Sequence, residues 1–134
     1  MATAFPVGAE KYLVGECSAA EAVGDAVYIS GTSNGRPAVR KVDRTNPAKM
    51  PARGVIVKKA GTVCIVQMAG VVGGGIYSGL TPNKSMFVAA DGTLTETPPA
   101  RPVTGQVYRQ TVAFVISSTS ILVQTEAPLI LVGA

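Results

Sequence analysis

The sequence predicts an all-β protein, built as an antiparallel β-sandwich or barrel-like module with an extended N-terminal arm. Short runs rich in Val, Ile and Thr recur along the chain, and turn residues separate them. The 134 residues include 15 Gly and 9 Pro, which interrupt the chain too often for long helices. No helical segment alternates with the strands, so we do not expect a parallel sheet with crossover helices.

About nine or ten short strands are expected, at the spacing that is typical of a sandwich or barrel. The pairs Asn34-Gly35, Ala60-Gly61 and Asp91-Gly92 predict tight turns between strands, because Asn, Asp and Gly tolerate positive φ. Three consecutive glycines at 73–75 indicate either a flexible kink or a close approach of another backbone. The expected strands cover 25–31, 38–42, 54–61, 61–70, 85–90, 93–97, 105–117 and 121–125, and an apolar segment at 127–134 follows.

The chain divides into an N-terminal arm, residues 1–22, and a β-rich domain, residues 23–134. The arm has no sustained hydrophobic period, and we expect it to be extended, with a short strand near residues 12–15 as an addition. Ser18 and Glu21 have the spacing of a capping box, so a helix of one turn is possible before Gly24-Asp25 ends it.

The composition indicates a protein that assembles with others. Charged residues make up only 15% of the chain, against about 25% in an ordinary soluble domain. A surface that is poor in charge favours self-association or a large partner. The net charge is +4, but the basic residues are scattered and aromatic residues are few, so nucleic-acid binding is not expected. The longest apolar run is far shorter than the roughly 20 residues that span a bilayer, so no membrane interaction is expected.

The residue types needed for common catalytic sites are missing. The chain has no His, which excludes Ser-His and Cys-His nucleophilic systems. We expect Asp25, Asp43 and Asp91 to stabilise turns, because their side chains bond to nearby backbone there. The glycine-rich stretch at 71–79 lacks the Lys and Ser/Thr of a phosphate-binding loop. We therefore expect no enzyme activity, no cofactor and no metal.

Two cysteines are present, and a protein made in the cytoplasm normally keeps such thiols reduced. Cys64 lies in an apolar strand and is expected to be buried, whereas Cys17 lies in a polar stretch and is expected to be exposed. A disulfide between Cys17 and Cys64 is the alternative.

The second half of the chain carries a family resemblance. A Gly-Leu-Thr-Pro turn at 79–82 precedes a strand, a Gly-containing turn and a Thr-rich strand; a Gly-x-Val-x-x-x-x-Val-Ala strand and a Ser/Thr turn before "ILV" follow. Asn83 stands where the pattern usually has Gly, and Asn tolerates positive φ. Together with the Gly24-Asp25 turn, this pattern resembles the capsid decoration, or cement, proteins of tailed bacteriophages, and modules of phage tail fibres.

The resemblance implies a structural protein of the virion, made in the host cytoplasm and bound to the outside of the capsid. Its partners would be the major capsid protein and further copies of itself, as a homotrimer or another homo-oligomer. It would reinforce contacts between major capsid subunits. A tail-fibre or baseplate attachment module is the alternative.

The N-terminal arm supplies the candidate contact residues. Fixing its backbone costs about 1–2 kcal/mol per residue, so its apolar side chains must bind something that offsets this cost. We expect them to lie as a strap against a neighbouring subunit or the capsid; the alternative is an edge strand added to their own domain. The candidates are Phe5, Val7, Tyr12, Leu13 and Val14.

Overall fold

The structure is a computed structural model that describes residues 10–133. Within these residues nearly all regular structure is β, and one turn of 3-10 helix lies at Pro47–Lys49. The strands are β1 (Lys11–Glu16), β2 (Ala26–Ser33), β3 (Arg36–Lys41), β4 (Gly54–Ala60), β5 (Val63–Val72), β6 (Ser85–Val88), β7 (Leu94–Thr95), β8 (Gln106–Arg109), β9 (Thr111–Ser117), β10 (Ser120–Gln124) and β11 (Leu129–Val132).

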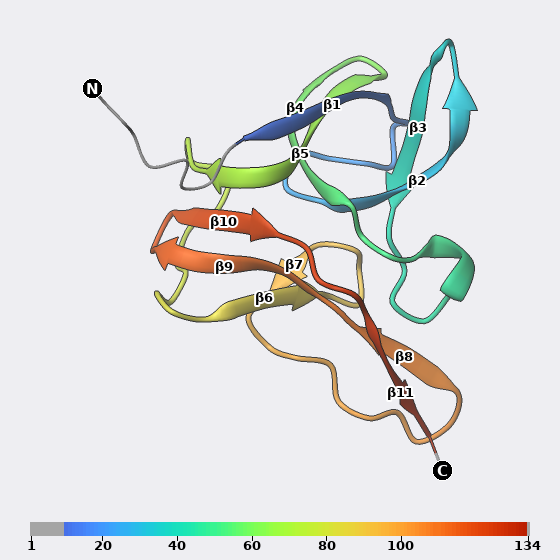
Figure 1. Ribbon diagram of the computed structural model, residues 1–134, viewed down its shortest axis with the longest axis vertical. Helices are drawn as coiled ribbons and strands as arrows, with labels where there is room; N and C mark the ends of the chain where they lie inside the picture. The colour runs from blue at the N-terminus through green and yellow to red at the C-terminus, as the bar shows by residue number, and fades with distance from the viewer. Residues whose placement is uncertain (1–9, 134) are drawn as a thin grey trace.

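The first five strands form a closed barrel, in the order β1-β3-β2-β4-β5. The barrel closes because β1 pairs with β5, antiparallel, from Lys11↔Ala69 to Glu16↔Val63. On its other side β1 meets β3 at a single parallel contact, Glu16↔Ala38. Figure 1 shows these strands grouped in the upper half of the molecule.

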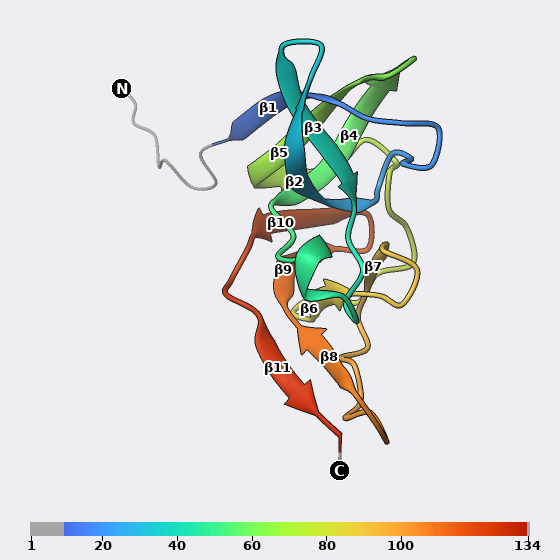
Figure 2. The same cartoon turned by 90° about the vertical axis from the view of Figure 1, so that its right-hand side faces the viewer.

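The last part of β5 continues out of the barrel into a second set of strands. There β5 pairs with β10, and the order continues through β9 and β6 to β7. β8 and β11 form a separate two-stranded ribbon. This ribbon extends from the sheet to the end of the molecule opposite the barrel (Figures 1 and 2).

Two apolar cores hold this arrangement together. The barrel encloses a small cluster of buried residues: Cys17, Val27, Val39, Ile56, Cys64 and Val66. A larger cluster combines barrel residues such as Ala26 and Val55 with Val88, Val112 and Ile121 of the second set of strands. Because these residues share one core, the barrel and the second set pack as a single unit.

The prediction of an all-β, barrel-like module is confirmed. The Asn34-Gly35 turn has positive φ at both residues, 52° and 73°, as a tight hairpin requires, and Asn83 has φ 72°. The predicted strand at 105–117 is wrong in one respect, because it is two strands that separate at Gln110. The glycines at 73–75 form an open turn, since an added Cβ would meet nothing within 4 Å.

The short strand expected near residues 12–15 is present as β1, but it is part of the barrel and not of an extended arm. Residues 11–16 are a barrel strand, so within the described residues the alternative, a strand added to their own domain, is what the structure shows. The one-turn helix is absent. A turn takes its place, in which the Glu21 carboxylate accepts hydrogen bonds from the backbone N–H and the hydroxyl of Ser18, both at 2.7 Å. The boundary at residue 22 therefore does not separate an arm from the barrel.

Candidate interaction surfaces

The candidate contact residues of the N-terminal segment have different environments. Phe5 and Val7 lie outside the described residues. Tyr12 and Val14 are each 52% exposed on the outer side of β1. Leu13 points the other way and packs against the core of the barrel. Of the described candidates, only Tyr12 and Val14 are placed to meet a partner.

A row of apolar side chains crosses the neighbouring strands. Val71 of β5 is paired with Leu122 of β10, which is paired with Phe114 of β9. Side chains at paired positions lie on the same face of a sheet, so these three form one row. Ile116, two residues after Phe114, lies on the same face. Val71, Phe114 and Ile116 are each at least 40% exposed.

We call the half-exposed residues on these adjoining strands the lateral strip: Tyr12, Val14, Val71, Phe114 and Ile116. Their strands β1, β5, β10 and β9 are consecutive neighbours, and they lie on one side of the molecule in Figure 1. The run at 111–117 signalled a strand in the sequence, but its continuous apolarity did not show which side chains face outward. The strip could therefore not be recognised without the strand pairing.

A second apolar surface lies on the ribbon. Leu129, Ile130 and Val132 of β11 are 64%, 52% and 54% exposed. Consecutive residues of a strand point to opposite faces, so both faces of β11 are apolar and exposed. Val103 is 87% exposed, and its backbone lies against Gly133 at the end of the ribbon.

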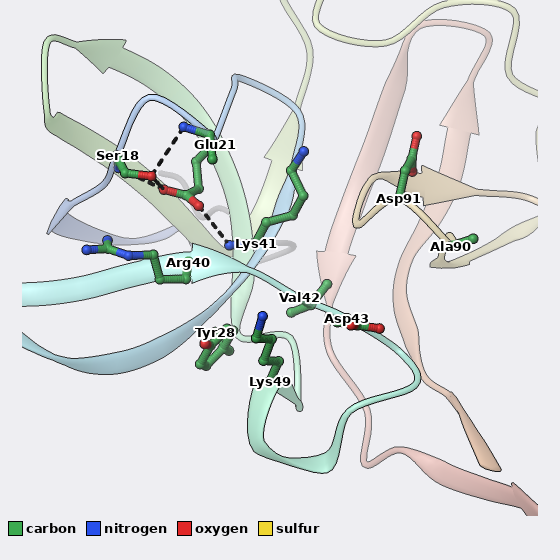
Figure 3. Close-up of a pocket in the computed structure, with 11 residues that line it drawn as sticks. Ser18, Glu21, Tyr28, Arg40, Lys41, Val42, Asp43, Lys49, Ala90 and Asp91 are labelled. Carbon is green, nitrogen blue, oxygen red and sulfur yellow. Dashed lines mark hydrogen bonds between the residues drawn. The ribbon is translucent and has the colours of Figure 1, made fainter. Parts of the chain in front are cut away.

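A hollow lined by several charged side chains lies between the barrel and the β6–β7 turn and has a volume of about 440 Å³ (Figure 3). Tyr28, Arg40 and Lys49 come from one side of it, and Asp91 from the other. The C-terminal end of β3 and residues of the loop at 18–21 complete its wall.

The carboxylates near this hollow stabilise the barrel's own loops. The Glu21 carboxylate also accepts from the Lys41 backbone N–H at 3.2 Å. Burial raises the pKa of Glu21, but the hydrogen bonds from Ser18 and Lys41 outweigh it and lower the pKa below its ordinary value. Asp25 accepts from the Ala22 N–H at 2.8 Å and lies 3.5 Å from the Lys41 ammonium. These groups fix residues 17–25 beside β3.

The turn roles predicted for the aspartates are confirmed. Asp43 accepts from the N–H and hydroxyl of Thr45, at 2.9 and 2.6 Å. Asp91 makes the same pair of bonds with Thr93, at 3.1 and 2.6 Å. Hydrogen bonds from these threonine hydroxyls are the main cause that lowers the pKa of each carboxyl group.

Both cysteines are free thiols inside the barrel. Cys64 is buried as predicted, but the expectation that Cys17 is exposed is wrong, because the turn after β1 directs it into the core. Burial, followed by a hydrogen bond with Cys17, raises the pKa of Cys64 to about 12. Within residues 10–133, no three His, Cys, Asp or Glu side chains lie close enough to hold a metal ion.

Comparison with known proteins gives no match to a protein-family model, a curated protein or a solved structure. In the part of the chain that the structure describes, no helix has the length and apolarity needed to cross a membrane.

Proposed function

We propose that the chain is a structural protein of a phage virion, which binds the outside of the head and reinforces contacts between major capsid subunits. The observation that carries the proposal is the lateral strip, whose half-exposed apolar side chains lie on β1, β5 and β9, three of four adjoining strands. The resemblance of residues 23–125 to phage decoration proteins supplies the kind of partner.

The strip has the properties of a surface that binds another protein. Its residues lie on paired strands, so their positions are fixed before binding and little backbone entropy is lost. Fully burying a Val, Ile or Phe side chain contributes roughly 1.5–3 kcal/mol. The strip has several such side chains that are half exposed before binding, and burying them is sufficient for a binding site. Their apolar character alone does not determine which protein binds there.

The location on the virion tests the proposal. A gold-labelled antibody against the chain should decorate the heads of particles of the encoding phage in negative-stain images. Labelling at the tail tip or along fibres would instead favour the alternative, a tail-fibre or baseplate attachment module. The absence of the chain from purified particles would overturn both.

Binding to stripped heads tests the surface. Phe114→Lys places a charge in the strip at a side chain that is already 40% exposed, so the fold should persist. We expect this change to weaken head binding at least roughly tenfold, since desolvating a charge without a partner opposes association. Ile29→Lys is the matched control, because Ile29 is 45% exposed on β2, which is not paired with β1 or β5.

Particle stability tests the reinforcing role. Heads that carry the protein should resist heat and osmotic shock better than stripped heads, because a protein that binds only the assembled shell stabilises that state. Equal resistance of the two preparations would contradict reinforcement and leave only attachment to the surface.

A further inference from the structure

The free edge of β11 has a specific pattern of backbone groups. β11 pairs with β8 from Leu129↔Arg109 to Val132↔Gln106, and within the described residues it pairs with no other strand. The Gly133 N–H donates to the Gly105 carbonyl at 2.8 Å, so Gly133 faces β8. In an antiparallel pair, alternate residues face the partner, so Ile130 and Val132 direct their N–H and C=O groups away from β8.

The other edge of the ribbon is already occupied. Tyr108 of β8 donates its N–H to the Arg44 carbonyl at 2.6 Å. Tyr108 lies opposite Ile130, which confirms the alternation. The open edge of the ribbon is therefore that of β11.

Two features of this edge limit how another strand can join it. The Val132 carbonyl already accepts a hydrogen bond from Arg101 Nε at 2.6 Å. Pro128, which the same alternation places outward, has a carbonyl but no N–H. The edge thus offers the N–H and C=O of Ile130, the N–H of Val132 and the C=O of Pro128.

We propose that β11 pairs with β11 of a second copy of this chain, antiparallel and about a two-fold axis, with Ile130 opposite Ile130. In this register each Ile130 donates to and accepts from its counterpart. Each Val132 N–H donates to the Pro128 carbonyl of the other copy. Pro128 has no N–H to donate, but in this register it lies opposite the Val132 carbonyl of the other copy, which already accepts a hydrogen bond from Arg101. The edge is complementary to itself in this register.

The side chains fit the same arrangement. Ile130 lies beside Ile130 on one face, and Leu129 lies beside Leu131 of the other copy on the opposite face, so every cross-strand pair is apolar. Residues 127–133 contain no charged side chain. Exposed edge strands usually carry charges that prevent such pairing. A second copy supplies both the apolar surface and the backbone groups that β11 requires.

The contact is small, which sets the strength we expect. Pairing of two four-residue strands should bury less than the roughly 1,200 Å² at the lower limit of stable interfaces, so the isolated dimer should dissociate at micromolar concentrations. Copies held side by side on a larger surface would pair more completely, because their effective concentration reaches the millimolar range. The inference concerns the purified chain and holds whether or not the virion assignment does.

Sedimentation equilibrium of the full chain tests it. We expect a reversible monomer–dimer equilibrium between about 10 and 300 µM. Ile130→Pro removes the central N–H without breaking a bond inside the ribbon, since that N–H faces outward, and should weaken dimerisation at least roughly tenfold. Ile130→Lys should also weaken dimerisation, because the two lysines would repel each other. This variant replaces the proline variant in the test if the latter does not fold. Phe114→Lys is the control and should leave the dimer intact.

Cross-linking checks the register. With Ile130→Cys, a short bis-maleimide should link two copies, whereas Ile116→Cys, similarly exposed on β9, should give little product. A chain that remains monomeric at about 300 µM, or an oligomer that both Ile130→Pro and Ile130→Lys leave unchanged, would overturn the proposal. So would equal cross-linking at the two positions.

Discussion

The side chain of Gln110 pairs with the backbone of Ala52 in the way that a neighbouring strand would. The Ala52 N–H donates to Gln110 Oε1 at 2.7 Å, and Gln110 Nε2 donates back to the Ala52 carbonyl at 2.9 Å. The same amide nitrogen donates to the Glu126 carbonyl at 2.9 Å. Gln110 is only 1% exposed, and it links the entry to β4 with the β8–β9 junction and the chain after β10.

Replacing Gln110 should therefore be costly for stability. Gln110→Leu has a similar volume but leaves the Ala52 N–H and two carbonyls without partners in a buried place. An unsatisfied buried polar group costs about 1–3 kcal/mol, so we expect the free energy of unfolding to fall by about 3 kcal/mol. Urea denaturation measures this change. Gln124→Ala, at an exposed glutamine of β10, is the control, and a similar loss in both variants would contradict the role given to Gln110.

The Glu21 carboxylate predicts a loss of stability in acid. Its pKa in the folded protein lies below the ordinary value of 4.5, so protons bind more tightly to the unfolded chain. The contribution of Glu21 is complete above pH 4.5 and is lost as the pH falls through the folded pKa. In Glu21→Gln, the unfolding free energy should fall less between about pH 6 and about pH 3 than it does in the wild type. An identical pH dependence of the two proteins would refute the coupling.

Gly54 lies where β4 passes β5, and the structure leaves no room for a side chain at this position. A Cβ at this position would overlap the Gln67 carbonyl oxygen and lie 2.9 Å from Val66 Cγ1. Because the first obstacle is backbone, Gly54→Ala should cost about 1–3 kcal/mol, the range for overpacking. Gly31→Ala, on β2 with nothing within 4 Å of the added Cβ, should cost much less. Thermal unfolding of the two variants gives the comparison.

The thiols should be unreactive in the folded protein. Both cysteines are buried, which keeps a reagent away from them, and burial and the hydrogen bond with Cys17 also raise the pKa of Cys64 to about 12, so almost no Cys64 thiolate exists at about pH 8. We expect a colorimetric thiol reagent to label neither cysteine until denaturant is added, and then to label both. Rapid labelling of the native protein would show that the barrel opens at β1 more readily than its packing implies.

Most of the fold could be predicted from the turn residues in the sequence. Asn34-Gly35 and Asp91-Gly92 specify their hairpins locally, because few other residues accept the positive φ of Asn34, Gly35 and Gly92, and because the Asp91 side chain accepts hydrogen bonds from Thr93 in its own turn. The break at Gln110 was not predictable in this way. Its cause is a bond to Ala52, far away in the sequence, while the local run from Val107 to Val115 is continuously compatible with a strand.

The contact surfaces were less predictable for the same reason. In the sequence Tyr12, Leu13 and Val14 are alike the sizeable apolar side chains of the N-terminal segment, and nothing local shows that Leu13 faces the core while its two neighbours face outward. Phe114 and Ile116 looked like ordinary core residues, since only the pairing of β9 with β10 shows which face of the strand is covered. Exposure in a β-protein depends on partners that the local sequence does not encode.

The pairing of β1 with β5 has a consequence for synthesis on the ribosome. β1 is translated before the other strands. Its residues Glu16 and Lys11 pair with Val63 and Ala69 of β5, which are translated much later. Distant pairings of this kind form slowly, because the intervening chain must first be ordered. The nascent barrel therefore remains open along one seam, with Leu13 uncovered, until the whole of β5 has left the exit tunnel. A pause in translation before that point would prolong the exposed state instead of helping the chain to fold.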